Sequence, residues 1–170
     1  MEKVLNRGFE KVKEAFRKTT GEILLPLRGT ETSAGYDFYA TEDLEIKPQD
    51  SVMFWTDVKA KMPKGEVLLA VIRSSMGIKN NLALSNTVGV IDSDYYSNPS
   101  NDGNIGICIR NNKPNFMFTD NNELVNLTTQ NTVHIKKGER VGQFIFVKFE
   151  EAENCNTKIK RTGGIGSTSK

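Results

Sequence analysis

The residues with the clearest capacity for chemistry stand where an apolar segment meets two carboxylates. Residues 89–96 read Gly-Val-Ile-Asp-Ser-Asp-Tyr-Tyr, and the chain then breaks into the polar turn 97–103. If the segment is a strand, its side chains alternate, so Asp92 and Asp94 share one face while Tyr95 lies on the other. A carboxylate beside an aromatic ring and free backbone groups suits a small polar ligand and an activated water. The spacing alone fits a solvated acidic turn equally well.

Four further segments are too polar or too rich in glycine for the strands that they interrupt. In 73–77, Arg-Ser-Ser-Met-Gly, the arginine fork suits phosphate oxygens, and the following amides could form an anion nest. Arg-Ser-Ser at the start of a helix is also an ordinary N-cap. The other three are 33–40, with an aspartate among aromatic residues, 138–143 (Gly-Glu-Arg-Val-Gly-Gln) and 163–168 (Gly-Gly-Ile-Gly-Ser-Thr).

The glycine-rich end of the chain could wrap a phosphate with its backbone N–H groups while Arg161 neutralises charge. An end of this composition is also typical of plain disorder. The sequence contains no G-x-x-x-x-G-K-[ST] P-loop, so scattered elements would have to hold any triphosphate.

Composition limits the classes of protein to consider. The 170 residues suffice for one domain with its own core, and 37% hydrophobic and 26% charged residues are ordinary for a globular protein. A net charge of +2 argues against a dedicated nucleic-acid binder. Cys108 and Cys155 form no C-x-x-C pair, and with His134 in an alternating strand pattern no zinc site is expected. We expect a cytoplasmic protein, because no apolar run approaches the roughly 20 residues of a membrane span and no secretory signal opens the chain.

The elements that must position these residues are mostly short strands. Residues 9–17 carry apolar side chains at helical spacing, which predicts a short amphipathic helix. Turn signals such as Pro63-Lys64-Gly65 punctuate the rest, which indicates a β-sandwich or barrel of jelly-roll type. The predicted strands are 22–27, 35–40, 43–47, 51–61, 66–73, 82–91, 104–110, 115–118, 131–136 and 142–149.

In this order on an all-β chain, the five segments form a specific pattern. The sequence resembles the trimeric, all-β dUTPase family (dUTP diphosphatases) over roughly residues 20–170, and an N-terminal extension and the insertion 96–102 resemble the type found in Gram-positive bacteria and their phages. The segments that match the five family motifs are 34–37, 73–77, 89–95, 138–143 and 163–168.

The resemblance implies a jelly-roll-type β-barrel with a short N-terminal helix and a flexible Gly-rich C-terminal tail. The implied organisation is an N-terminal extension (1–20), a barrel domain (21–156) and a C-terminal lid segment (157–170). It also implies a homotrimer in which each active site draws on three subunits. Neither a membrane nor direct nucleic-acid binding is expected.

The resemblance further implies hydrolysis of dUTP to dUMP and pyrophosphate, which keeps uracil out of DNA and supplies dUMP. Asp92 matches the acid that orients and deprotonates the water attacking the α-phosphorus in line. Tyr95 matches the residue under the deoxyribose, where its ring leaves no room for a 2′-hydroxyl. Asn86, with the backbone of Gly89 and Ile91, matches the positions that read the uracil edge.

The phosphate contacts implied by the resemblance come from three segments. Ser74 also lies near the scissile bridge in the family, and Asp37 matches an acid that meets waters of a Mg²⁺ held mainly by the three phosphates. Ile165 stands where the family most often has an aromatic residue that stacks on uracil. The other implied substrate-binding positions are Arg73, Ser75, Gly77, Gln143, Arg161, Gly166, Ser167 and Thr168.

Three alternatives compete with this interpretation. A dCTP deaminase shares the jelly roll and an Arg-Ser-Ser motif, but lacks the Asp-x-Asp-Tyr hairpin in this form and needs a catalytic glutamate with no counterpart here. The insertions 96–102 and 114–131 could bind a regulatory protein, although their Asn-rich composition favours plain solvent-exposed loops. A domain that has lost catalysis is the third alternative, and the intact Asp92, Arg73 and Gln143 argue against it.

Overall fold

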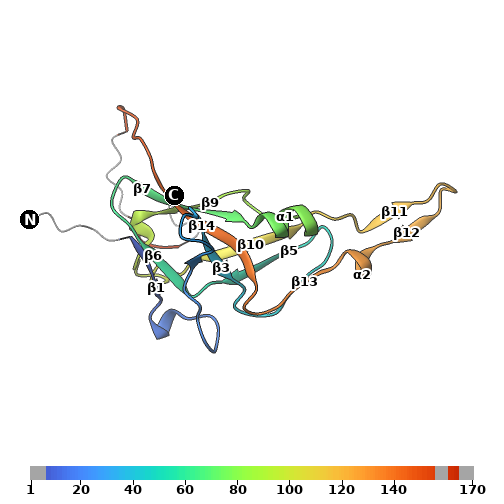
Figure 1. Ribbon diagram of the computed structural model, residues 1–170, viewed down its shortest axis with the longest axis horizontal. Helices are drawn as coiled ribbons and strands as arrows, with labels where there is room; N and C mark the ends of the chain where they lie inside the picture. Colours follow the sequence, from blue (N-terminus) through green and yellow to red (C-terminus); the bar gives the residue numbers. More distant parts are fainter. Residues whose placement is uncertain (1–6, 156–160, 165–170) are drawn as a thin grey trace, which may run out of the picture.

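The computed structural model describes residues 7–155 and 161–164, and short antiparallel strands dominate it (Figure 1). Of the predicted fold class, the mostly-β character is confirmed. The described strands are β1 (Gly8–Lys11), β2 (Leu27–Arg28), β3 (Tyr36–Tyr39), β4 (Leu44–Ile46), β5 (Ser51–Trp55), β6 (Val58–Lys61), β7 (Glu66–Ile72), β8 (Leu82–Leu84), β9 (Gly89–Asp92), β10 (Gly106–Asn111), β11 (Phe116–Phe118), β12 (Leu124–Asn126), β13 (Val133–Ile135) and β14 (Arg140–Lys148).

The strands pair into one five-stranded sheet and several smaller ones. The largest has the order β2-β3-β14-β7-β9, and a three-stranded sheet has the order β5-β10-β8. Two-stranded pairs join β1 to β6, β13 to β4 and β11 to β12. The non-consecutive neighbours show that the chain crosses between sheets rather than meandering through one. No helix in the described part of the chain is long and apolar enough to cross a membrane.

The core is filled from the inward faces of these sheets. Phe38 and Phe144, on the neighbouring strands β3 and β14, are fully buried with ring centroids 4.6 Å apart. Leu68 of β7 and Ile109 of β10 are equally buried in the same cluster. Each such side chain contributes about 1.5–3 kcal/mol by leaving water, so the central strands are held firmly.

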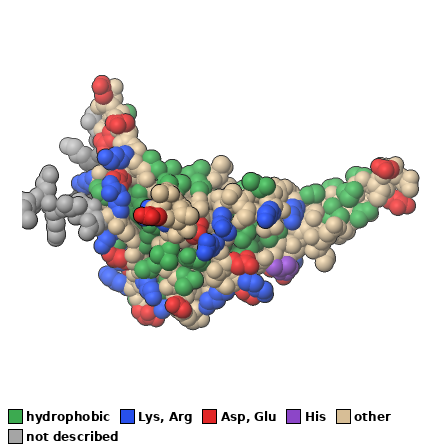
Figure 2. Space-filling view, in the orientation of Figure 1, with side chains coloured by type: hydrophobic (Ala, Val, Ile, Leu, Met, Phe, Trp, Pro, Cys, Tyr) green, Lys and Arg blue, Asp and Glu red, His purple; other side chains and the backbone are tan. Residues whose placement is uncertain are grey.

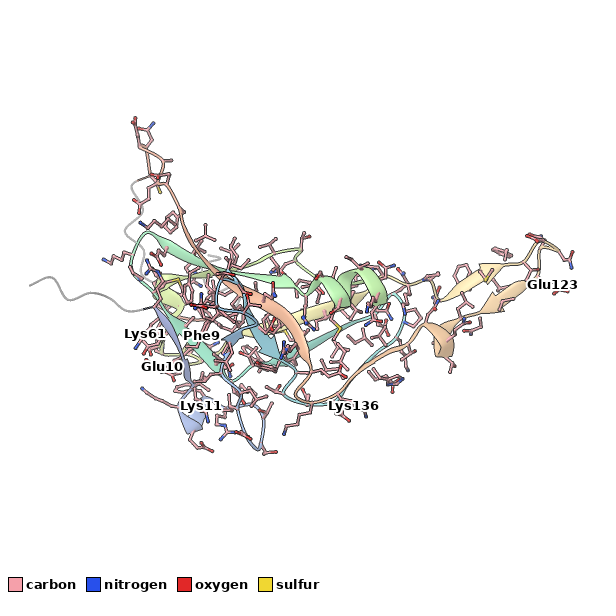
Figure 3. The ribbon with its side chains drawn as sticks, in the orientation of Figure 1. Phe9, Glu10, Lys11, Lys61, Glu123 and Lys136 are labelled. Atoms are coloured by element: carbon pink, nitrogen blue, oxygen red, sulfur yellow. The ribbon has the colours of Figure 1, made fainter. Side chains whose placement is uncertain are left out.

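The predicted helix over residues 9–17 is wrong. Residues 8–11 form strand β1 on the edge of β6, and only a single 3₁₀ turn, η1 (Glu14–Phe16), follows. The strand brings the Phe9 ring within 5.3–5.7 Å of Tyr36, Phe144 and Phe146, and Glu10 pairs with Lys61 across the ladder (Figure 3). A short isolated helix is only marginally stable in water. Burial of the Phe9 ring and pairing with the edge of β6 therefore favour the strand over the helix that the spacing predicts.

Several predicted strands are shorter or divided. The prediction 51–61 divides into β5 and β6 at Asp57, whose φ of 54° turns the chain. The prediction 82–91 divides into β8 and β9 at a turn where Thr87 has a φ of 65°. Of 22–27, only Leu27 belongs to a strand. The seven-residue helix α1 (Ser74–Asn80) follows β7.

The two insertions differ from each other. Residues 114–131 form the hairpin β11–β12 and the short helix α2 (Thr128–Asn131), and Figure 1 shows this arm projecting from one end of the body. Its side chains are largely exposed, and Figure 2 shows an apolar surface with acidic groups at the tip. The prediction of a plain exposed loop is wrong for 96–102, because Asn98 and Asp102 are buried.

A buried carboxylate anchors the N-terminal segment to the body. Asp57 is fully buried, and its two oxygens accept hydrogen bonds from the backbone N–H groups of Lys18 and Thr19, each at 2.9 Å. The Thr19 hydroxyl and Asn104 Nδ2 complete the set at 2.6 and 2.8 Å. A buried charge is tolerated when donors surround it in this way.

We therefore expect Asp57→Ala to destabilise the protein by more than about 2 kcal/mol, because four donors lose their acceptor and the positive φ disfavours alanine. Thermal unfolding measured by circular dichroism checks this. Thr19→Ala, which removes one of the four donors, should cost about 1 kcal/mol. Equal melting temperatures for the two variants would contradict the assignment.

Candidate active site

The segment 89–95 changes from a strand to a tight turn at Asp92. β9 pairs with β7 in antiparallel register, with Gly89 opposite Ala70 and Asp92 opposite Val67. The 3₁₀ turn η2 (Ser93–Tyr95) begins directly afterwards, so the predicted strand alternation beyond Asp92 is wrong. The turn directs Tyr95 inward, where it is 8% exposed, while Asp92 and Asp94 remain about half exposed.

A pocket of about 500 Å³ lies beside this turn. Its floor is apolar, and its polar groups come from the β8–β9 turn, from η2 and from residues 161–164. Such a pocket, with few polar groups over an apolar floor, is typical of a small-molecule site. The lining residues are Met53, Ala70, Leu84, Ser85, Asn86, Gly89, Val90, Ile91, Asp92, Tyr95, Ile105, Gly106, Ile107, Cys108, Arg161 and Gly164.

The turn that carries Asn86 is narrow. The Thr87 N–H donates to the Leu84 carbonyl at 2.9 Å, and the Val88 N–H donates to the Asn86 carbonyl at 2.6 Å. A Cβ on Gly89 would lie 3.0 Å from the Cβ of Ala70 on the neighbouring strand. Gly89 thus lets the edge strand β9 lie close to β7. Residues of β9 line the pocket.

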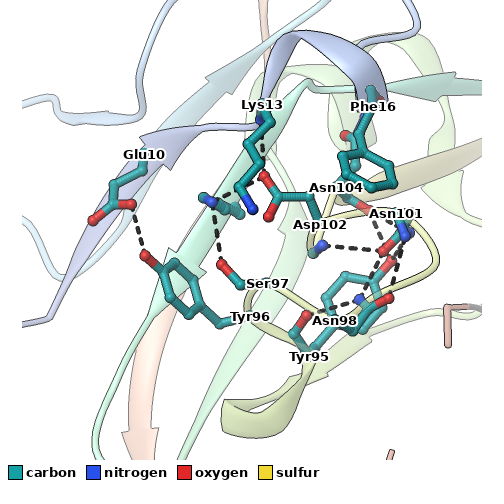
Figure 4. A network of polar contacts seen from close by, with 12 residues as sticks. Glu10, Lys13, Phe16, Tyr95, Tyr96, Ser97, Asn98, Asn101, Asp102 and Asn104 are labelled. Atoms are coloured by element: carbon teal, nitrogen blue, oxygen red, sulfur yellow. Dashed lines mark hydrogen bonds and ion pairs between the residues drawn. The ribbon is translucent and has the colours of Figure 1, made fainter. Parts of the chain in front are cut away.

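Two hydrogen bonds hold Tyr95 at its hydroxyl. Its hydroxyl donates to the Asn104 carbonyl at 2.7 Å and accepts from Asn101 Nδ2 at 2.7 Å (Figure 4). Burial raises the pKa of the Tyr95 phenol, while the Asn101 hydrogen bond and the nearby Arg161 charge act in the opposite direction. The ring is therefore a neutral and well-positioned wall of the pocket.

Arg161 contacts both acids of the segment 89–95. Its Nη2 donates to Asp92 Oδ2 at 2.5 Å and its Nε donates to Asp94 Oδ1 at 2.9 Å. The guanidinium carbon lies 5.6 Å from the centroid of the Tyr95 ring, within range of a cation–π interaction. Both acids contact Arg161, but only Asp92 lines the pocket. This geometry favours Asp92 over Asp94 as the acid that faces a ligand.

A second polar cluster forms where β3 meets β14. Asp37 is 3% exposed and accepts from Gln143 Nε2 at 3.2 Å and from Arg140 Nη1 at 3.3 Å. Residues three apart on a regular strand face opposite sides, but the register shifts between Arg140 and Gly142. This bulge allows both side chains to reach Asp37. A Cβ on Gly35 would lie 2.8 Å from Gln143 Oε1, so glycine leaves room for that side chain.

The Arg-Ser-Ser segment lies at the same end of β14. The Arg73 N–H donates to the Val141 carbonyl at 3.0 Å, and Arg73 stands as the N-cap of α1. Ser74 is exposed and Ser75 partly so. The Gly77 amide donates to the Arg73 carbonyl at 3.0 Å, so it belongs to the helix rather than to an open nest. Of the predicted phosphate positions, Arg73, Ser74 and Ser75 therefore present the more available groups.

The strand register separates these two clusters within one chain. Asp92 lies opposite Val67 of β7. Arg73 lies six residues beyond Val67 along the chain, directly after the end of that strand. At about 3.3 Å per residue, this distance is about 20 Å. Arg73 and Asp92 of the same chain therefore lie near opposite ends of β7 rather than side by side.

The predicted site residues thus fall into three sets. Asn86, Gly89, Ile91, Asp92, Tyr95 and Arg161 meet at the pocket. The cluster at the start of β14 contains Asp37 and Gln143 and lies beside the segment Arg73, Ser74, Ser75 and Gly77. Ile165, Gly166, Ser167 and Thr168 lie outside the described residues.

Sequence reasoning missed three participants. Arg140 contacts Asp37, and its signal was the Gly-Glu-Arg-Val-Gly-Gln segment itself, whose second glycine marks a bulge. Asn101 contacts the Tyr95 hydroxyl, and nothing in the spacing of an Asn-rich turn distinguished it from its neighbours. Cys108 lines the pocket because its strand β10 pairs with β8, and this pairing depends on the sheet order.

Comparison with known proteins connects this geometry to a family. A family model described as dUTPase matches residues 22–169. A relative from Lactococcus lactis, named deoxyuridine 5'-triphosphate nucleotidohydrolase, is 43% identical over 164 residues, which cover 95% of this chain and 97% of the relative.

Solved structures give the same result. The crystal structure of dUTPase from Streptococcus mutans matches with a TM-score of 0.68 and 39% identity, over 86% of this chain and 98% of that chain. A mutant dUTPase from phage phi11 of S. aureus matches with a TM-score of 0.63 and 26% identity, over 91% of this chain and 97% of that chain. The phage structure is described as revealing the coordination of a structural Mg(II) ion.

The place of Cys108 in the pocket predicts how fast its thiol reacts. Cys108 is half-buried and accepts a hydrogen bond from the Ser85 hydroxyl at 3.1 Å, whereas Cys155 is exposed. We expect a bulky maleimide to modify Cys155 much faster than Cys108, because access to Sγ limits the reaction. Peptide mass spectrometry over time measures both rates in one sample, and Cys108→Ser confirms the assignment. Equal rates would mean that the pocket is open to bulky reagents.

Proposed function

Because the chain belongs to the dUTPase family, we propose that it hydrolyses dUTP to dUMP and pyrophosphate. The observation that carries the proposal is the pocket, where Asp92, Tyr95 and the edge of β9 face one cavity. The reaction would keep uracil out of DNA by removing dUTP, and it would supply dUMP.

Uracil fits the edge of β9. Among the described strands β9 pairs with β7 alone, so its other edge offers backbone N–H and C=O groups to a ligand. Gly89 and Ile91 are two residues apart, and their backbone groups therefore point the same way. Alternating donors and acceptors complement the O2, N3–H and O4 edge of uracil, with Asn86 beside them. The narrow turn leaves little room for the methyl group of thymine, and the fixed order of backbone donors and acceptors disfavours the exchanged pattern of cytosine.

Tyr95 is suited to recognising the sugar. Its ring is a rigid pocket wall fixed through its hydroxyl. A deoxyribose packed on that face would bring its C2′ close to the ring, so a 2′-hydroxyl would be both crowded and without a hydrogen-bond partner. This supports discrimination against UTP.

Asp92 is the proposed general base. A half-exposed carboxylate at the pocket rim can orient a water and accept its proton as the water attacks the α-phosphorus. Arg161 holds this carboxylate. Phosphate oxygens of dUTP would compete for the same guanidinium fork, so binding of the substrate would release Asp92 for the water.

Arg161 is the one cationic side chain in the described lining of the Asp92 pocket, so three phosphates need further groups. Arg73, Ser74, Ser75, Gly77 and Gln143 are the proposed contacts, and the separation of about 20 Å along β7 supports their coming from another copy of the chain. The proposed assembly is a homotrimer with shared sites. Ser167, Thr168, Gly166 and Ile165 are proposed to complete the site from the C-terminal segment.

Mg²⁺ fits this arrangement only through water and substrate. No group of three His, Cys, Asp or Glu side chains that could hold a metal ion occurs among the described residues, and Asp37 is a single carboxylate already hydrogen-bonded to Gln143 and Arg140. Mg²⁺ characteristically keeps several waters and binds substrate phosphates, so Asp37 would contact it through a water. When bound, the ion would neutralise phosphate charge.

We also propose the sheet arrangement and the division of the chain from its membership of the dUTPase family. The sheets would form a jelly roll, with residues 1–20 as an extension, 21–156 as the barrel domain and 157–170 as a lid segment. A cytoplasmic location suits a nucleotide substrate. The pocket contains no glutamate among its described lining residues, which favours hydrolysis over the deamination of dCTP.

The direct test is a pyrophosphate-release assay that compares dUTP with dTTP, dCTP and UTP. We expect release from dUTP alone at low substrate concentration. Ammonia release from dCTP would instead support the deaminase alternative.

Asp92→Asn should lower turnover by about 10²–10⁴-fold, because the amide cannot accept the proton of the water. Binding of a non-hydrolysable dUTP analogue, measured by calorimetry, should persist. Asp94→Asn is the matched control, since it also removes one contact to Arg161 but lies outside the pocket lining. An inactive Asp94→Asn beside an active Asp92→Asn would reverse the assignment.

Mixed assemblies test the sharing of sites. Asp92→Asn chains refolded together with Arg73→Ala chains should regain activity that neither variant has alone, because one site can receive Asp92 from one copy and Arg73 from the other. With random mixing, about a quarter of the sites would be intact. Mixtures no more active than the separate variants, in oligomers verified by light scattering, would place both residues in one subunit's site.

A further inference from the structure

The segment 96–104 is built from buried side-chain amides. Asn98 is 5% exposed and Asn104 is fully buried. Asn98 Nδ2 donates to the Tyr95 carbonyl at 2.9 Å and to Asn101 Oδ1 at 2.7 Å. Asn104 Nδ2 donates to the anchored carboxylate of Asp57 at 2.8 Å. The segment is thus tied to the body by the same network that holds the N-terminal residues (Figure 4).

Asn101 occupies the centre of this network. Its Nδ2 donates to the Tyr95 hydroxyl at 2.7 Å and also approaches the Asn104 carbonyl at 3.3 Å. Its Oδ1 accepts from Asn98 Nδ2 and from the Gly103 N–H at 3.1 Å. The amide is therefore fixed at both its oxygen and its nitrogen, and it can hold the Tyr95 hydroxyl in only one place.

The Tyr95 hydroxyl has no freedom left within this arrangement. It donates its proton to the Asn104 carbonyl and accepts from Asn101, so both of its polar functions are used. On the open side, a Cβ placed on Gly164 would lie 3.1 Å from Asn101 Nδ2 and 3.7 Å from the Tyr95 hydroxyl. Asn101 therefore stands where the ring, the loop and residues 161–164 meet.

We propose that Asn101 is a positioning residue for substrate selection, which fixes the Tyr95 ring so that the pocket distinguishes deoxyribose from ribose. This inference rests on the proposed function of Tyr95. A ring excludes a hydroxyl only while it cannot tilt away, and a tyrosine ring tilts most easily at the end far from its Cβ. Asn101 holds that end. Removing the amide would let the ring move and admit a 2′-hydroxyl.

The test compares kcat/KM for dUTP and UTP in wild type and in Asn101→Ala. We expect the dUTP preference to fall by about tenfold, equivalent to about 1.4 kcal/mol of discrimination. Tyr95→Phe retains the ring but removes the hydroxyl, and should lose a similar part of the preference. The double variant should lose little more, because both changes break the same hydrogen bond.

Ser100→Ala is the matched control. Its hydroxyl donates to Asn98 Oδ1 in the same loop at 2.9 Å and does not contact Tyr95. We expect this variant to retain the wild-type preference. A loop that acts only as a scaffold would lower both kcat/KM values together and leave their ratio unchanged.

Retention of the wild-type ratio in folded Asn101→Ala would overturn the inference while the proposed function stands. If Asn101→Ala does not fold, Tyr95→Phe decides, since an unchanged ratio there would show that the hydroxyl anchor has no role in selection. A wild-type protein that hydrolyses UTP as well as dUTP would overturn the proposed role of Tyr95 and this inference with it. Absence of dUTP hydrolysis would overturn the proposed function itself.

Discussion

The antiparallel pairing of β7 with β14 on one side and β9 on the other is the constraint on which the site depends. Seven consecutive residues of β7 pair with β14, and four of them also pair with β9. This register places the Asp92 end of β9 beside the beginning of β7 and the Arg73 segment beyond its end. The separation between Asp92 and the Arg73 segment proposed to bind phosphate is therefore set by the sheet. Rotation of side chains does not change the distance between their backbones.

The second determinant is a network of buried and partly buried amide and carboxylate side chains rather than an apolar contact. Asp57, Asn104 and Asn101 link the N-terminal segment, the turn between β5 and β6 and the wall of the pocket. Buried polar groups are costly unless each has its partner, so a network in which the partners are present permits few alternative arrangements. The apolar core gives the molecule its stability, while these amides determine where the Tyr95 ring lies.

The sequence predicts several residues that line the pocket, whereas it predicts the elements around them less well. Segments such as 73–77 and 89–95 each have an ordinary structural explanation when taken alone, and it is their order along an all-β chain that indicates nucleotide chemistry. The N-terminal strand was predicted as a helix because the spacing of Phe9 and Phe16 carries no information about the edge of β6. Asn101 was missed because its role depends on a contact with Tyr95 that forms only after the turn folds. The bulge that brings Arg140 to Asp37 was equally hidden, since registers arise from pairing rather than from local composition.

The arm formed by β11, β12 and α2 has a different relation to the rest of the molecule. An isolated two-stranded ribbon is at best marginally stable in water, and both faces of this one are exposed, with Phe118 and Leu124 on one face and Met117 and Val125 on the other. The backbone amide protons of the arm should therefore exchange with solvent through local opening. Those of β7 and β14 should exchange only when the whole sheet unfolds. Because the arm contributes no residue to the buried core cluster, its sequence and length can diverge during evolution with little effect on the fold that supports catalysis.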